Sequence, residues 1–194
     1  MVLHRLQSAF ILGYHGCDSS IAAKLLDGHN FKPSQNDYDW LGHGIYFWEA
    51  NPKRGLDYAR ELKAKRPEMK IRNPDVVGAV IDLGLCLDLT TLAAVEQVKK
   101  AHDKLQSLAR LEGSQLPENK SDLRRHLDCL VLETLHTIRS DENEAPLDSV
   151  KGVFTEGNPI YATSGFYEKT HIQICVCNPE CIKGVFRVPT RFFN

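Results

Sequence analysis

The order of its hydrophobic periodicities constrains the fold of this chain more than any single motif. Apolar runs typical of strands alternate with helical spacing up to residue 90, a helical hairpin follows, and strand-like runs return towards the end. The expected strands are 9–14, 44–48, 76–83, 150–157, 171–178 and 182–188, and the expected helices are 19–27, 52–66, 91–112 and 121–139. This order predicts one α+β domain spanning residues 1–194, with a helical hairpin insertion at about 91–139.

The charge balance excludes a strong overall attraction to nucleic acids or acidic membranes. The 24 Lys and Arg residues face 25 Asp and Glu residues, for a net charge of -1. Basic residues gather locally at 63–66, 99–100 and 124–125. They have two alternative interpretations, a solvated helix face and a groove that binds nucleic acid. No segment has the roughly 18 apolar residues of a membrane span, and the first apolar run is too short for a secretory signal. We expect a cytoplasmic protein without a membrane partner.

The cysteine pattern does not predict a metal centre. Cys175, Cys177 and Cys181 form a cluster that lacks the paired Cys-x₂-Cys spacing of a zinc site. On a strand, Cys175 and Cys177 point to the same face, where thiols pack as small apolar groups. We expect buried thiols and no metal, with a metal site or a disulfide as the alternative.

Three short segments carry residues suited to ligand binding. In the first, Tyr14-His15-Gly16, the histidine ends an apolar strand and the glycine lets a ligand approach the backbone. The alternative is that His15 caps the following helix. In the second, Gly42-His43-Gly44 leads into an aromatic strand, and Tyr46 on that strand suits stacking against a planar heterocycle. A tight turn before a core strand explains the same residues.

The third segment is the expected strand near the C-terminus. His171, Gln173 and Cys175 share one of its faces by the two-residue period. A buried Gln173 needs a hydrogen-bond partner, whereas on an edge strand it would face water.

Together these segments resemble the ADP-ribosyltransferase superfamily, in particular its diphtheria-toxin and poly(ADP-ribose) polymerase branch. His15-Gly16, Ser34 and Gly44-Ile45-Tyr46-Phe47 match the branch in order and spacing, and the helix at 53–65 follows as expected. The resemblance covers most of the chain outside 91–139. It implies a split β-sheet core with flanking helices and NAD⁺ as the substrate, and it places Gly44 among the NAD-binding residues.

The resemblance also implies a role for each matching residue. His15 is expected to hydrogen-bond the adenosine ribose, and the backbone of Gly16 to hold the nicotinamide amide. Tyr46 is expected to stack on the nicotinamide ring, with Tyr58 as a second aromatic wall. Ser34 is expected near the nicotinamide or its ribose.

One position departs from the family pattern. Counting back from Asn178-Pro179, the catalytic glutamate of the branch falls on Gln173. Glutamine can bind the ribose hydroxyl, but it cannot offset the positive charge of the transition state. Glu156 and Glu168 are candidate replacements, with Glu156 preferred, and plain surface carboxylates are the alternative.

The loop before the last two strands lies where the superfamily reads its acceptor. Its Tyr161, Phe166 and Tyr167 are suited to holding a protein side chain or stacking on a base, or else they cover the edge of the core.

The sequence therefore predicts a NAD-dependent mono-ADP-ribosyltransferase that modifies a protein side chain or a nucleic-acid base. Its compact form resembles toxins and phage-defence effectors, for which an antitoxin or a regulatory protein would be a partner. The alternatives are a NAD glycohydrolase and an inactive module that binds NAD⁺ or a protein.

Overall fold

A computed structural model describes residues 10–66, 68, 70–121 and 124–193. Its strands are β1 (Ile11–Asp18), β2 (Ile45–Glu49), β3 (Pro74–Ile81), β4 (Cys86–Asp88), β5 (Asn119–Ser121), β6 (Arg124–Arg125), β7 (Ser149–Phe154), β8 (His171–Val176) and β9 (Ile182–Arg187). Its α-helices are α1 (Ser19–Leu26), α2 (Pro52–Lys65), α3 (Leu92–Glu112) and α4 (His126–Asp141), and short 3₁₀ helices cover Pro179–Cys181 and Thr190–Phe192.

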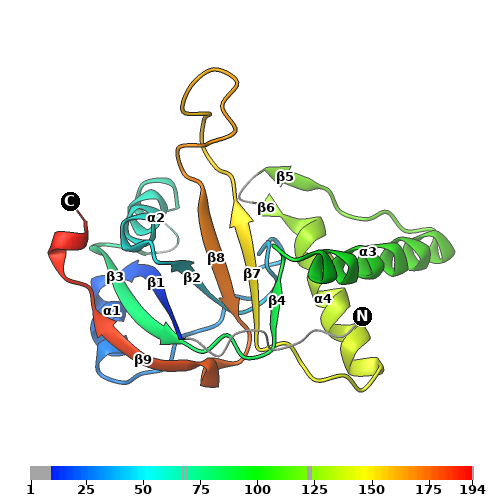
Figure 1. The fold of residues 1–194 in the computed structure, drawn as a ribbon, viewed down its shortest axis with the longest axis horizontal. Coiled ribbons are helices and arrows are strands. Elements are labelled where there is room, and N and C mark those ends of the chain that lie inside the picture. The colour runs from blue at the N-terminus through cyan, green and yellow to red at the C-terminus, as the bar shows by residue number, and fades with distance from the viewer. Residues whose placement is uncertain (1–9, 67, 69, 122–123, 194) are drawn as a thin grey trace.

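The described strands form a seven-stranded sheet in the order β4-β7-β8-β2-β1-β3-β9, beside a small β5–β6 ladder (Figure 1). Every pairing in the large sheet is antiparallel except that of β4 with β7. β1 pairs with β3 along all eight of its residues, but with β2 at only two. The prediction of a mixed α+β fold is confirmed.

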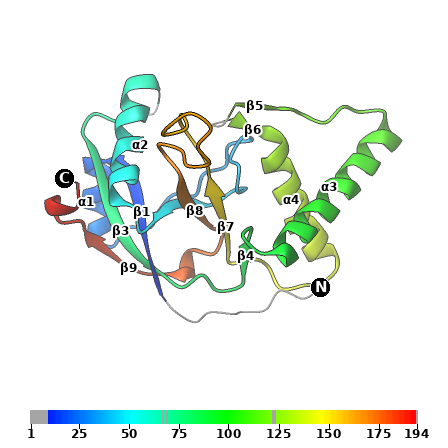
Figure 2. The same ribbon diagram turned by 45° about the horizontal axis from the view of Figure 1, so that its top comes forward.

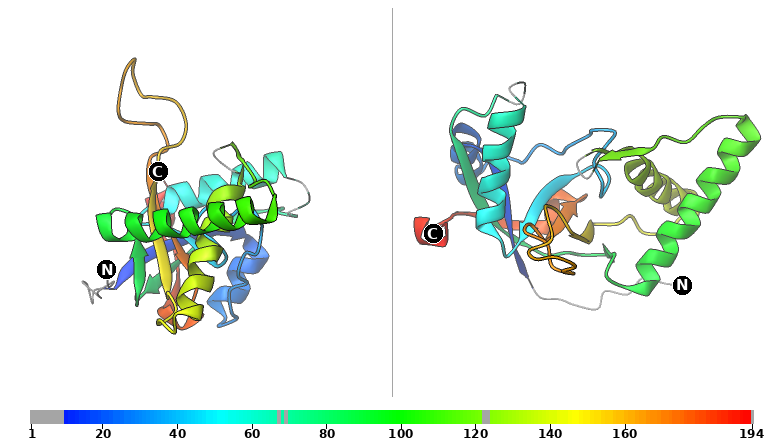
Figure 3. Two further views of the ribbon diagram at one scale, coloured as in Figure 1. Left: turned by 90° about the vertical axis from the view of Figure 1, so that its right-hand side faces the viewer. Right: turned by 90° about the horizontal axis from the view of Figure 1, so that it is seen from above.

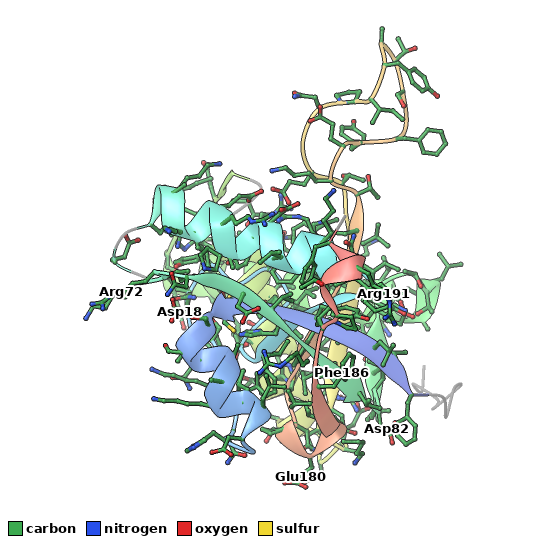
Figure 4. The ribbon with its side chains drawn as sticks, turned by 90° about the vertical axis from the view of Figure 1, so that its left-hand side faces the viewer. Asp18, Arg72, Asp82, Glu180, Phe186 and Arg191 are labelled. Carbon is green, nitrogen blue, oxygen red and sulfur yellow. The ribbon has the colours of Figure 1, made fainter. Side chains whose placement is uncertain are left out.

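Helices cover both faces of the sheet. On one face, called here the α2 face, helix α2 packs on β1 and β3, and the α3–α4 hairpin packs on β7 and β8 through a core that includes Leu132, Val150 and Cys175. Figure 2 shows α2 and the hairpin on either side of β2 and β8. The other face, called the α1 face, is covered by α1, and Figure 4 shows α1 and α2 on opposite sides of β1 and β3.

Two helix starts agree with the capping residues in the sequence. The Asp18 carboxylate accepts a hydrogen bond from the Ser20 N–H at 3.0 Å, and the Asn51 side chain accepts one from the Arg54 N–H at 3.0 Å. Asp18 also accepts from the backbone N–H of Arg72 at 2.8 Å, so it ties the start of α1 to the turn before β3, as Figure 4 shows.

The predicted start of the second hairpin helix is wrong. Residues 119–121 and 124–125 form the β5–β6 ladder, residues 122–123 lie outside the described residues, and α4 begins at His126 rather than at 121. The Asn119 side chain accepts hydrogen bonds from the N–H groups of Leu127 and Asp128, at 3.0 and 3.3 Å. A capping side chain therefore does precede the helix, but Asn119 provides it across the ladder.

The first strand was also predicted too short. It was expected over 9–14, of which residue 9 lies outside the described residues, and β1 continues to Asp18 because β3 pairs with it throughout. His15 and Gly16 therefore lie within a strand and not after one. All six cysteines are free thiols, of which Cys86 and Cys177 are partly exposed.

None of the helices in the described part of the chain has the length and apolar character that a membrane crossing requires. Within the same residues, no group of His, Cys, Asp and Glu side chains is arranged to hold a metal ion.

Candidate functional site

The β1–β2 ladder ends abruptly in the middle of the sheet. Its last residue pair joins Tyr14 to Trp48. The Ala50 N–H donates to the Leu12 carbonyl at 2.9 Å, so the backbone groups of Leu12 and of every second residue after it face β2. Gly16 belongs to this set, and its N–H and C=O point towards β2 beyond the end of the ladder.

The side chain of His15 occupies the position of the next ladder bond. In the register of the ladder, Gly16 lies opposite Tyr46, whose carbonyl would accept from the Gly16 N–H. Instead, the Tyr46 carbonyl accepts from His15 Nδ1 at 2.9 Å. Because a carbonyl only accepts, Nδ1 carries the proton. The N–H and C=O of Gly16 and the N–H of Tyr46 are thereby left without their ladder partners, and we call these three groups the β1–β2 clamp.

The His15 and Tyr46 side chains lie on opposite faces of the sheet. The His15 ring contacts Phe31 and Phe47 on the α1 face, with centroids 5.3 and 5.7 Å away. Burial there lowers the pKa of His15 and favours the neutral ring. Tyr46 projects from the α2 face by the alternation of β2. The two residues thus meet through the Tyr46 backbone, not as two side chains around one ligand.

The hydroxyl of Tyr46 is engaged within the protein. It accepts from the Leu41 N–H at 3.0 Å and donates to the Gly42 carbonyl at 2.8 Å. Burial raises the pKa of this phenol. Tyr46 therefore anchors the turn that leads into β2, and as a residue it is only partly buried.

The glycines and serine of the motif hold the elements around the clamp together. A Cβ on Gly16 would overlap the carbonyl oxygen of Gly55 in α2, and one on Gly44 would lie 2.5 Å from Cys175 Sγ. Ser34 exchanges two backbone hydrogen bonds with Gly44, at 2.7 and 3.1 Å. Close packing against neighbouring atoms thus explains both glycines, and Ser34 lies beside Gly44.

Tyr58 lies on the α2 face next to the clamp. Its ring centroid is 4.8 Å from that of Trp48, and the Arg54 guanidinium carbon lies 5.7 Å from the Trp48 ring centroid and 5.9 Å from that of Tyr58. The Gly55 backbone links this group to the clamp, because a Cβ on Gly55 would contact Trp48. The aromatic side chains beside the clamp are therefore Tyr58, which is partly exposed, and Trp48, which is buried.

Gln173 is partly buried and has a hydrogen-bond partner. Its Oε1 accepts from Trp40 Nε1 at 3.1 Å, and in the sheet it pairs with Trp48. Because β8 lies between β7 and β2, the alternative that Gln173 faces water on an edge strand is wrong.

The two candidate carboxylates lie in different environments. Glu156 is nearly buried, with 12% of its side chain exposed, and it forms an ion pair with Arg54 at 2.8 Å. Glu168 is exposed and accepts from the Asn158 N–H at 3.1 Å, which closes the loop between β7 and β8. Only Glu156 therefore lies near the sheet, beside His171 rather than Gln173.

A second group of candidate side chains lies on the same face of the sheet as Trp48, and we call it the Arg54 cluster. It consists of Trp48, Arg54, Tyr58, Glu61, Glu156, Lys169 and His171. Arg54 is 7% exposed and His171 is 6% exposed. Sequence reasoning did not identify Trp48 or Arg54. The available signal was the spacing of Arg54, Tyr58 and Glu61, which recur on one face of α2.

The β7–β8 loop projects from the body of the protein, as Figures 1 and 3 show. Tyr161 and Phe166 are 59% and 67% exposed, so they do not cover the edge of the core. The alternative that these two aromatic residues cover the edge of the core is therefore wrong.

Two pockets flank the clamp without including it. One of about 460 Å³ lies against the N-terminal half of α2 and is lined by Arg54, Glu61 and Lys169 among others. Another of about 280 Å³ lies on the α1 face, where Phe31 and Ile45 line it. Phe31 also contacts His15, so the second pocket adjoins the strand split from the opposite face.

Comparison with known proteins gives little functional information. The chain is 25% identical over 188 residues to the uncharacterized protein MJ0359 of Methanocaldococcus jannaschii, in an alignment that covers 88% of this chain and 83% of that protein. No protein-family model matches the chain, and no solved structure matches it significantly. The functional interpretation therefore depends on the site itself.

Proposed function

We propose that this protein binds NAD⁺ at the β1–β2 clamp and transfers its ADP-ribose to a macromolecular acceptor. The observation that carries this proposal is the interrupted ladder. A central strand pair rarely leaves its backbone groups without partners, because unpaired buried groups are costly. Here His15 takes the Tyr46 carbonyl, and Gly16 presents one donor and one acceptor side by side.

These groups are complementary to the nicotinamide carboxamide. Its carbonyl oxygen accepts one hydrogen bond, matching the Gly16 N–H, and its NH₂ group donates, matching the Gly16 carbonyl. Tyr58, which is partly exposed and packs on the buried Trp48, supplies flat apolar surface beside the clamp for the pyridinium ring. A split in the middle of the sheet, with helices on both sides, also agrees with the architecture that the family resemblance implies.

The chemistry requires the nicotinamide–ribose bond to break while an acceptor atom attacks the ribose. Gln173 lies two strands away from Gly16 on the α2 face, where its amide can hold a ribose hydroxyl. It supplies no negative charge to the oxocarbenium-like transition state. Loss of one such electrostatic interaction costs about 3–4 kcal/mol, so a slow reaction is expected unless another group compensates.

Labelled NAD⁺ tests the proposal. The protein is incubated with cell extract and NAD⁺ carrying one label on the nicotinamide and another on the adenine. We expect free nicotinamide to appear and the adenine label to enter protein or nucleic acid, and the labelled fraction identifies the acceptor class. Gly16→Ala should lose both signals, whereas Gly184→Ala should keep them, because a Cβ on Gly184 meets no atom within 4 Å.

The glutamine at position 173 favours a second candidate, an inactive module that binds NAD⁺ or a partner protein. This module would retain NAD⁺ but release no nicotinamide in the same experiment. A NAD glycohydrolase would release nicotinamide together with free ADP-ribose and leave macromolecules unlabelled. If NAD⁺ neither binds nor turns over, the proposal is contradicted.

A further inference from the structure

His171 is a buried imidazole whose orientation is fixed on one side only. It begins β8, is 6% exposed, and its Nδ1 donates to the Lys169 carbonyl at 2.5 Å. That bond places the proton on Nδ1, so the neutral ring carries its lone pair on Nε2. Nε2 is buried and has no hydrogen-bond partner among the described residues.

Other unpaired polar atoms lie in the same cluster. Trp48 Nε1 and Arg54 Nε are also buried without a partner in the described part of the chain. The Trp48 ring centroid is 6.3 Å from that of His171, and the Arg54 guanidinium carbon lies 5.7 Å from the Trp48 ring. Two donors and one acceptor suit a group that both accepts and donates, such as a hydroxyl.

His171 lies close to Gln173, the position where the family pattern has its catalytic glutamate. His171 and Gln173 project from the same face of β8, one alternation apart. Neither carboxylate candidate is comparably placed, because Glu156 is paired with Arg54 at 2.8 Å and Glu168 is exposed in the loop. Of these groups, His171 is the basic one that is both beside Gln173 and unpaired.

We propose that His171 is the general base of the proposed transfer reaction, and that the acceptor is therefore a protic group, O–H or N–H, rather than a carboxylate. The inference rests on the proposed function and names the acceptor chemistry for that site. The acceptor proton moves to His171 Nε2 as its oxygen or nitrogen bonds to the ribose C1″. The C1″–nicotinamide bond breaks, and nicotinamide leaves as a neutral molecule with the electron pair. The imidazolium then returns its proton to water.

The charged groups around His171 nearly balance. Arg54 and Glu61 approach from α2, and Glu156 and Lys169 approach from the β7–β8 loop. Burial is the main cause that lowers the pKa of His171, and the Arg54 charge adds to it, while the hydrogen bond to the Lys169 carbonyl and the two carboxylates oppose this shift. The ring is therefore neutral near pH 7 and ready to take a proton, and the carboxylates stabilise the imidazolium that forms.

Access to His171 runs past Arg54. The pocket of about 460 Å³ is lined by Arg54, Glu61, Lys169 and Thr170, the residue that precedes His171. Arg54 also lies over the Trp48 ring, whose centroid is 6.3 Å from that of His171. An acceptor side chain that enters the pocket would replace the Arg54 contacts and reach the imidazole.

Two substitutions and one pH profile test the role. His171→Asn keeps a donor for the Lys169 carbonyl and removes Nε2, while His171→Gln is a second variant that leaves a non-basic group near the Nε2 position. His102→Asn is the control, because His102 lies on α3 and is partly exposed. For each protein we measure the NAD⁺ dissociation constant, the single-turnover transfer rate from pH 5 to 8, and the stability of the product in neutral hydroxylamine, which cleaves carboxylate esters.

If His171 is the base, His171→Asn transfers roughly 10²- to 10⁴-fold more slowly than wild type, with NAD⁺ affinity nearly unchanged. The wild-type rate rises with pH as the imidazole loses its proton, the variants lack this rise, and the product resists hydroxylamine.

A wild-type rate independent of pH, a fully active His171→Asn variant, or a hydroxylamine-labile product overturns the inference while leaving the transferase proposal in place. The wild-type profile and the product test apply even where a variant does not fold. A wild-type protein that releases no nicotinamide overturns both.

Discussion

Replacing His15 with valine should close the β1–β2 clamp. Without the imidazole, the Tyr46 carbonyl is available to the Gly16 N–H, and the ladder can extend by a residue pair with two hydrogen bonds. Valine suits the strand and keeps apolar contact near Phe31 and Phe47. The substitution therefore exchanges one side-chain hydrogen bond for two ladder bonds.

The expected effects on stability and on binding differ. A neutral hydrogen bond contributes about 0.5–1.5 kcal/mol. The substitution loses one such bond, gains up to two, and replaces the imidazole with a smaller side chain. These changes offset one another, so the free energy of unfolding should stay within about 1 kcal/mol of wild type. Closing the clamp removes two hydrogen bonds to the carboxamide, about 1–3 kcal/mol in total. NAD⁺ binding should therefore weaken roughly 5- to 150-fold.

Urea unfolding, calorimetric titration with NAD⁺ and amide hydrogen exchange measure these effects. The Gly16 amide should exchange more slowly in His15→Val than in wild type. His15→Asn is the matched control, since its side-chain amide can still donate to the Tyr46 carbonyl and should preserve binding. If His15→Asn loses as much affinity as His15→Val, the imidazole contacts NAD⁺ directly. If His15→Val changes neither the NAD⁺ affinity nor the exchange rate of the Gly16 amide, His15 does not hold the clamp open.

Four further outcomes are expected. Gly16→Ala should destabilise the fold by about 1–3 kcal/mol in urea unfolding, because its Cβ overlaps the Gly55 carbonyl, while Gly184→Ala should have little effect; equal losses would contradict the packing argument. Tyr46→Phe should cost about 1–3 kcal/mol, since it removes the partner of the Leu41 N–H and leaves the Gly42 carbonyl with only the Cys175 thiol at 3.6 Å, and an unchanged urea midpoint would count against this. Gln173→Glu should raise the nicotinamide release rate by supplying the missing charge, and a lower rate would argue against a ribose contact. Burial lowers the pKa of His15 below 6.5, so as the pH falls the unfolded chain takes up a proton at His15 more readily than the folded protein does. The stability of the wild type should therefore fall more steeply below pH 6.5 than that of His15→Val. Thermal midpoints with the same pH dependence in both proteins would contradict this prediction.

Local patterns predicted much of the fold because they report local physics. Asp18 and Asn51 cap helices through their own side chains, a relation that spans three residues or fewer. The start of α4 could not be found in this way, because Asn119 caps it from eight residues away across a ladder. Strand ends have the same limitation, since β1 continues to Asp18 only because β3 lies beside it.

The sequence named the residues that form the β1–β2 clamp, but it predicted neither their arrangement nor the Arg54 cluster. The glycines at 16 and 44 are explained by atoms of α2 and β8, which no local pattern names. The faces taken by His15 and Tyr46 follow from strand alternation once β1 is known to continue. Trp48 and Arg54 were missed because an aromatic residue in a strand and an arginine in a helix are common, and only the pairing of β2 with β8 and the packing of α2 on β2 bring them near His171.

The most direct test of the clamp is a nuclear magnetic resonance titration of the ¹⁵N-labelled protein with NAD⁺ and, separately, with nicotinamide. Both ligands should move the backbone amide signals of Gly16 and Tyr46 most, and nicotinamide alone should suffice. Unchanged signals at these two amides, or shifts confined to the pocket on the α1 face, would contradict carboxamide binding at the split between β1 and β2.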